Sequence, residues 1–65
     1  MEIGDKFFYI KNRAIYKVIG IDIIVEDKTS LVLQDDKNAL YIYNYLDFYN
    51  KFIPVANNIE YKKGA

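Results

Sequence analysis

The stretch Ala14-Ile-Tyr-Lys-Val-Ile-Gly-Ile-Asp-Ile-Ile-Val-Glu26 is the segment on which the fold of this chain most depends. It holds seven Val or Ile residues among thirteen, with one glycine and no proline. Because β-branched side chains lose rotamer freedom in a helix and pack well on a pleated surface, the run favours a strand. A strand of this length exceeds the usual size, so the sequence also predicts a bend within it.

The position of Gly20 predicts where this strand bends. With strict alternation, Lys17 would share a face with the aliphatic residues Ile15, Ile19, Ile21, Ile23 and Val25. A bulge at Gly20 shifts the register by one residue. The inner face then holds Tyr16, Val18, Ile21, Ile23 and Val25, and the outer face holds Lys17, Asp22, Ile24 and Glu26. Since this arrangement exposes the charged side chains, we expect the bulged register.

Short polar turns divide the first part of the chain into strands. The predicted strands cover residues 6–11, 14–26, 30–34 and 39–44, joined by turns at residues 12–13, 26–29 and 35–38. Asn12 is a residue type that tolerates the left-handed conformation of a tight turn. In the fourth strand Leu40 and Ile42 alternate with Tyr41 and Tyr43. If the aliphatic pair faces the core, both tyrosines face outward.

The apolar period changes after the fourth strand. Tyr45, Phe48 and Phe52 recur at helical spacing, which predicts one helical turn within residues 45–51. A last short strand at residues 52–55 tolerates Pro54 at a sheet edge. Residues 1–55 therefore predict one mostly β domain: a small SH3-like barrel of four to five antiparallel strands with one short helical turn before the last strand. Residues 56–65 predict a polar tail or a short extra strand.

Several short motifs resemble those of a known family. Gly4-Asp5-Lys6-Phe7-Phe8-Tyr9 resembles the opening strand of many SH3-like barrels. The segments at residues 16–21, 46–48 and 52–55 are similar to a small uncharacterised bacterial and phage family of such barrels, over residues 4–55. The resemblance implies the fold. In the fourth strand that family tends to carry Trp and Arg, where this chain has Tyr41, Tyr43 and Asn44, so no binding site is carried over.

The composition argues against catalysis. The chain has no cysteine and no histidine, so it lacks thiolates, disulfides, the commonest metal ligand and the commonest general base. The carboxylate pairs at residues 26–27 and 35–36 lie in predicted solvated turns, where nothing drives their pKa values apart. Gly4, Gly20 and Gly64 form no glycine-rich loop. We expect no enzymatic activity, no cofactor and no metal site.

The charges balance overall but not along the chain. There are nine basic and nine acidic residues, yet residues 21–50 carry six acidic and two basic ones. A neutral net charge argues against a binder of duplex nucleic acid. The start of the chain does not resemble a signal peptide and no run reaches the length of a membrane span, so we expect a cytoplasmic protein without a membrane partner. The short length and the richness in Asn, Lys, Ile and Tyr resemble small accessory proteins of phages and mobile elements, which would place it in a host cytoplasm.

The tyrosines of the fourth strand and the helical turn are the main candidates for binding. With the acids nearby in the sequence, the predicted partner-binding residues are Tyr41, Tyr43, Tyr45, Tyr49, Asp35, Asp36 and Asp47. Tyrosine gives contact area at low entropic cost, and neighbouring acids suit a protein partner with a basic surface. The alternative is that these tyrosines only cap the core of a small barrel, with their hydroxyls in water.

Three functions follow from this pattern. The leading hypothesis is a non-catalytic protein-binding module, as in a phage or mobile-element protein that binds and inhibits a host protein. The second is a barrel that binds single-stranded nucleic acid, with stacking tyrosines and the basic residues Lys11, Arg13, Lys17, Lys62 and Lys63. The third is a homo-oligomeric structural protein, in which outward Val32 and Ile24 and a short last strand leave an edge for self-association or for an added partner strand.

Overall fold

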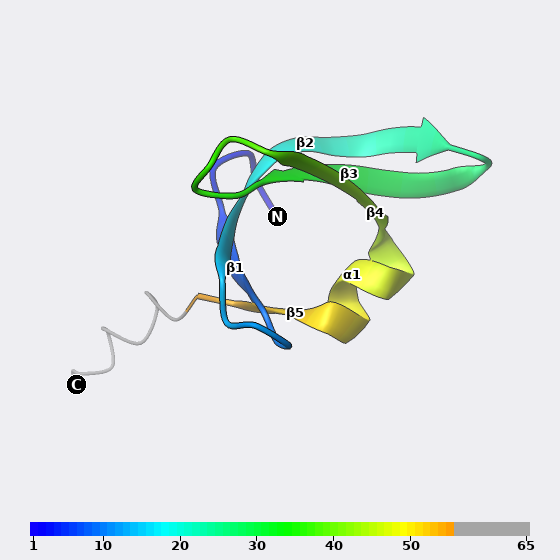
Figure 1. Ribbon diagram of the computed structural model, residues 1–65. Coiled ribbons are helices and arrows are strands. Elements are labelled where there is room, and N and C mark those ends of the chain that lie inside the picture. The colour runs from blue at the N-terminus through cyan, green and yellow to red at the C-terminus, as the bar shows by residue number, and fades with distance from the viewer. Residues whose placement is uncertain (56–65) are drawn as a thin grey trace.

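A computed structural model of the protein describes residues 1–55, which form one antiparallel sheet and one helix. The elements are β1 (Lys6–Tyr9), β2 (Ile15–Val25), β3 (Lys28–Gln34), β4 (Leu40–Asn44), α1 (Tyr45–Lys51) and β5 (Phe52–Pro54). The strand order is β4-β3-β2-β1-β5, and the strongly curved sheet is open between its two edge strands, with α1 at the gap (Figure 1). The predicted mostly β fold and the helical turn before the last strand are confirmed. The predicted tail or extra strand at residues 56–65 lies outside the described residues.

The long strand β2 carries two irregularities where one was predicted. Its pairing with β3 shifts between Val18 and Gly20, and again between Gly20 and Ile23. The first shift confirms the bulge that the sequence predicts beside Gly20. A Cβ atom on Gly20 would lie 3.3 Å from the Cγ2 atom of Val32, so a glycine relieves crowding between the paired strands.

The second irregularity lies at Asp22, whose backbone has a left-handed φ of 57°. Its amide donates to the Tyr45 hydroxyl at 3.3 Å, and that hydroxyl donates to the Asp22 carboxylate at 3.0 Å. A helix residue distant in sequence thus holds the bulge. The end of the strand departs from the prediction as a result. Ile21 packs against the core as expected, whereas Val25, expected inside, is exposed in the β2–β3 hairpin.

Several turn residues have the left-handed backbone conformation. The sequence predicted where the turns lie, but not every residue that takes this conformation. Glu26 and Asp27 both have positive φ and form a two-residue turn between β2 and β3, as type I′ hairpins require. In the β1–β2 turn, Arg13 takes the left-handed conformation with φ 62°. Asn12, which was predicted to take it, instead accepts the Ala14 amide on its side chain at 2.8 Å.

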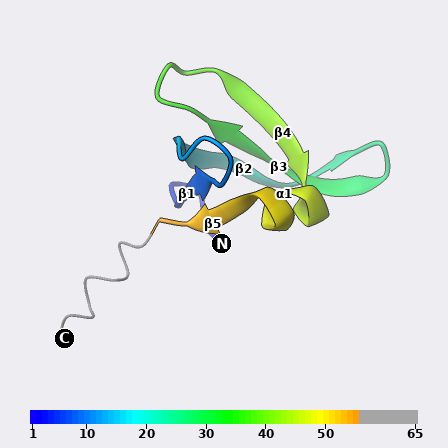
Figure 2. The same ribbon diagram turned by 60° about the horizontal axis from the view of Figure 1, so that its bottom comes forward.

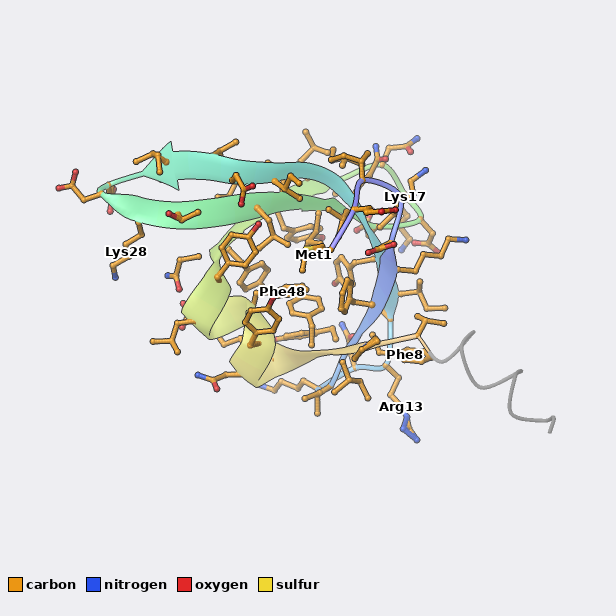
Figure 3. All side chains as sticks on the ribbon, turned by 180° about the vertical axis from the view of Figure 1, so that it is seen from behind. Met1, Phe8, Arg13, Lys17, Lys28 and Phe48 are labelled. Carbon is orange, nitrogen blue, oxygen red and sulfur yellow. The ribbon has the colours of Figure 1, made fainter. Side chains whose placement is uncertain are left out.

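The core lies inside the curve of the sheet. Its buried apolar residues are Tyr16, Val18, Leu31, Leu33, Phe48 and Phe52. The fully buried Phe48 ring contacts Phe7 edge-on at 4.8 Å and stacks on Phe52 at 5.1 Å. Figure 3 shows Phe48 inside the curve, with Phe8, Arg13 and Lys17 on the outer side. The helix therefore covers the inner face through aromatic packing, and each such pair contributes about 0.5–1.5 kcal/mol beyond its buried area.

A side-chain cap sets the start of α1. The Asn44 side chain accepts the amide of Asp47 at 3.0 Å, and the acidic Asp47 lies in the first turn of the helix. This satisfies a backbone donor that the helix leaves unpaired. The helix ends at Lys51. The amide of Phe52, the C-cap residue, donates to the carbonyl of Phe48, and the chain continues in an extended conformation into β5. Within residues 1–55, the helix α1 is not long and apolar enough to cross a membrane.

Candidate partner-binding surface

The register with β3 decides which face of β4 is turned to the core. Tyr41 pairs with Leu33 and Tyr43 with Leu31, and both leucines are fully buried on the inner face. Residues paired across an antiparallel sheet share a face, so the two tyrosines point inward. Leu40 and Ile42 are 59% and 57% exposed on the outer face. The inward position of the tyrosines agrees with the alternative in which they cap the core, and it follows from the register with β3.

Tyr41 and Tyr43 join two tyrosines from the other side of the sheet. We call Tyr9, Tyr16, Tyr41 and Tyr43 the tyrosine cluster. The Tyr16 ring meets the Tyr41 ring at 5.3 Å and the Tyr9 ring at 6.2 Å, both edge-on. Beneath them, Phe52 contacts Tyr9 and Tyr43 at 5.1 Å each. Tyr16 is buried, but Tyr41 is 36% exposed, and Tyr9 and Tyr43 are half-buried. The cluster forms a rigid aromatic surface with one side in solvent.

Asp35 borders the tyrosine cluster at the β3–β4 turn. The Tyr41 hydroxyl donates to one of its carboxylate oxygens at 2.9 Å, and the amides of Lys37 and Ala39 donate to the other at 2.9 Å each. The hydrogen bond from the Ala39 amide is the largest of the effects that lower the pKa of Asp35 below its ordinary 3.8. Desolvation opposes it, and the hydrogen bonds from Tyr41 and Lys37 add to the lowering. The same carboxylate raises the pKa of Tyr41. Asp35 is thus held as an anion beside an exposed tyrosine.

Tyr43 lies at the helix side of the tyrosine cluster. Burial raises the pKa of its hydroxyl. The Lys51 ammonium lies 5.7 Å from the centre of the Tyr43 ring, within the range of a cation–π contact. The tyrosine cluster therefore has the Asp35 carboxylate at one end and the Lys51 ammonium beside Tyr43 at the other.

Tyr45 and Tyr49 form a second aromatic group on α1. Their rings stack at 6.1 Å, and Tyr49 is exposed. Desolvation, followed by the hydrogen bond to Asp22, raises the pKa of Tyr45. The Tyr45 hydroxyl is thus occupied in holding the β2 bulge, and Tyr49 stacks on it from the solvent side. These two predicted residues are separate from the tyrosine cluster.

The two remaining predicted acids have other positions. Asp47 lies at the start of α1, where the Asn44 side-chain amide donates to its carboxylate at 3.4 Å. Asp36 lines an open groove of about 290 Å³ on the outer side of the sheet, together with Asp35, Lys6 and Lys17. Asp35 therefore bonds to Tyr41 and also shares this groove with Asp36, whereas Tyr45, Tyr49 and Asp47 lie on α1.

Three residues of these groups were missed by sequence reasoning. Tyr9 and Tyr16 complete the tyrosine cluster, and Asp22 is the partner of Tyr45. The predicted inward position of Tyr16 was the available signal for that residue. No such signal existed for Tyr9, because both faces of the predicted strand at residues 6–11 carry apolar residues between the bounding lysines.

The outer face of the sheet is apolar and basic. Phe8 pairs with Ile15 on one side and Ile53 on the other, so the three share this face. An open groove of about 450 Å³ is lined there by Phe8, Tyr9, Ile10, Arg13 and Ile53. Lys6 pairs with Lys17 in the next row. Lys6, Lys17 and Arg13 therefore lie on the side opposite Tyr41 and Tyr43.

Comparison of the chain with protein families, with characterised proteins and with solved structures finds no match. The functional inference therefore rests on the geometry of the two faces of the sheet.

Proposed function

We propose that the protein is a non-catalytic protein-binding module, built on an SH3-like sheet, that contacts its partner through the tyrosine cluster and Asp35. The strand order β4-β3-β2-β1-β5 and the helical turn before β5 support the SH3-like assignment. The observation that carries the function is that Tyr41 remains 36% exposed although it points to the inner face.

The tyrosine cluster has the physical properties of a binding surface. Its rings are fixed by edge contacts with one another and with Phe52. A partner that covers them gains aromatic contact area with little loss of side-chain entropy, and the tyrosine hydroxyls can replace the lost hydrogen bonds to water.

The chemistry of the surface suits a partner segment that carries Lys or Arg. The low pKa of Asp35 keeps its carboxylate ionised, so it can pair with a cation beside Tyr41. The faces of tyrosine rings also attract cations, as Lys51 over Tyr43 illustrates within the chain itself. A basic, extended segment that lies along β4 would meet both features.

A nucleic-acid partner is less well supported by the placement of the basic residues. Stacking on the tyrosines requires basic residues on the same side to contact the phosphates. Lys17 and Arg13 lie instead with Lys6 and Phe8 on the outer side. Two of the five basic residues expected to contact phosphates thus lie opposite Tyr41 and Tyr43. Lys62 and Lys63 lie outside the described residues, and the basic residue beside the tyrosine cluster is Lys51.

The sequence suggests the biological setting in which such a module acts. A small accessory protein of a phage or mobile element that binds a basic site on a host protein would inhibit it by occlusion. In that setting the protein acts in the host cytoplasm, and its effect requires only binding.

Affinity capture with two neighbouring variants tests the proposed surface. Tyr41→Ala removes an exposed ring of the tyrosine cluster, and Leu40→Ala removes an exposed side chain of the same strand on the opposite face. We expect a bacterial lysate to yield a protein that is retained by the wild type and by Leu40→Ala but lost with Tyr41→Ala. Thermal melts of both variants verify that the fold is kept.

Nuclease treatment of the lysate separates the two classes of partner. Capture that survives the treatment supports a protein partner, whereas loss of every captured species would favour nucleic acid. Retention of the partner by Tyr41→Ala at the wild-type level would sink the assignment of the tyrosine cluster.

A further inference from the structure

The two edge strands of the sheet differ in how well they are protected. β5 has three residues and ends in Pro54, which has no amide to offer a further strand. β4 has five residues, Leu40–Asn44, with no proline, glycine or charged residue. Within residues 1–55 no strand pairs with its free side, and Figure 2 shows β4 as the outermost strand there. Its backbone therefore presents unpaired donors and acceptors, and none of the usual protective residues is present.

The sequence of β4 is complementary to itself. It reads Leu-Tyr-Ile-Tyr-Asn, with Ile42 at its centre. An antiparallel pairing about a twofold axis at Ile42 sets Ile42 against its own copy and Tyr41 against Tyr43. Aromatic and β-branched cross-strand pairs of this kind stabilise a sheet, and no like charges oppose one another along the strand.

We propose that β4 pairs with β4 of a second copy of this chain, in antiparallel register about Ile42. The interface is isologous, since each copy presents the same edge. It joins two five-stranded sheets into one and places the exposed Ile42 side chains of both copies in contact on the outer face, next to Val32 of each. On the inner face it sets Tyr41 of each copy against Tyr43 of the other, so the two tyrosine clusters become neighbours. This inference does not depend on the proposed partner, because it concerns the edge of the strand.

A single engineered cysteine tests both the pairing and its register. The chain has no cysteine of its own, so Ile42→Cys provides one thiol per copy at the predicted twofold axis. Leu40→Cys is the matched control, with nearly equal exposure on the same face of the same strand. In the proposed register Leu40 lies opposite Asn44 of the second copy, so two thiols at position 40 stay apart.

Under mild oxidation, we expect Ile42→Cys to form a covalent dimer at least about tenfold faster than Leu40→Cys, because pairing raises the effective concentration of the two thiols. Sedimentation equilibrium of the unmodified chain should show a monomer–dimer equilibrium. Mixing Leu40→Cys with Asn44→Cys should restore rapid cross-linking between the two variants. Equal rates for Ile42→Cys and Leu40→Cys, or a monomer throughout the micromolar range, would overturn the proposal.

Discussion

The inner and outer faces of β4 both carry large apolar side chains but have different roles. On the inner face Tyr41 and Tyr43 pair with buried leucines and join the tyrosine cluster. On the outer face Leu40 and Ile42 are more than half exposed. The inner face therefore combines packing with a polar, hydroxyl-bearing surface. The outer face is apolar surface that stays mostly exposed within residues 1–55.

The difference shows what strand alternation can establish. Alternation separates the residues of β4 into two sets, but it does not say which set is buried when both are apolar. The pairing with β3 decides which set is buried. Leu31 and Leu33 lie on the inner face of β3, and the register pairs them with Tyr43 and Tyr41. A tyrosine suits the rim of a small core better than a leucine because its ring can be buried while its hydroxyl reaches water.

The largest expected effect is a difference in the free energy of unfolding between substitutions on the two faces of β4. Tyr43→Thr removes a ring that contacts Phe52 at 5.1 Å, and we expect it to lower the free energy of unfolding by about 2–3 kcal/mol. Ile42→Thr keeps a β-branched residue at an exposed position and should cost less than about 1 kcal/mol. Urea unfolding of both variants measures the difference. Equal losses would mean that the faces are assigned incorrectly.

A smaller effect is expected at Asn44, where β4 passes into α1. Asn44→Ala removes the side-chain acceptor for the Asp47 amide, and we expect a loss of about 1 kcal/mol. Asn44→Asp retains an acceptor at the same position and should recover most of the stability. If the alanine variant is as stable as the wild type in urea, the cap does not hold the start of the helix.

The smallest effect concerns the pKa of Asp35. Tyr41→Phe removes one of the hydrogen bonds that lower this pKa, so the midpoint of the Asp35 titration, followed by NMR, should rise. The lowered pKa stabilises the fold above the ordinary value of 3.8, and this contribution is lost as the pH falls through the pKa of the folded state. The variant should therefore retain less of this stabilisation at neutral pH. An unchanged Asp35 titration would mean that the hydroxyl does not bond to the carboxylate in solution.

Most elements of the fold could be predicted from local sequence. The β-branched run around Gly20, the polar turns and the change of period at residue 45 lie where the structure has β2, the hairpin turns and α1. Each depends on residues adjacent in the chain, through backbone preference or turn chemistry. The bulge beside Gly20 was predictable for the same reason, since strict alternation would place Lys17 on an otherwise aliphatic face and a register shift at Gly20 exposes it.

The features that the sequence did not reveal depend on contacts between distant residues. The second bulge in β2 is held by Tyr45, which comes 23 positions after Asp22. The tyrosine cluster draws members from β1, β2 and β4, and only the curvature of the sheet unites them. Asp35 and Tyr41 could be paired in advance because one short turn separates them. Asp36, which was grouped with them by proximity in sequence, lines the outer groove with Asp35, and Asp47 lies in the first turn of α1.

The affinity of an isolated partner for two variants of β4 tests most directly whether the tyrosine cluster is the binding surface. With the protein captured by the wild-type chain, calorimetry should give a Kd at least about tenfold weaker for Tyr41→Ala, a loss of about 1.4 kcal/mol or more. The Kd for Leu40→Ala should stay within about twofold of the wild type, as expected for a residue outside the contact. An unchanged Kd for Tyr41→Ala together with a weakened one for Leu40→Ala would assign binding to the outer face and contradict the proposal.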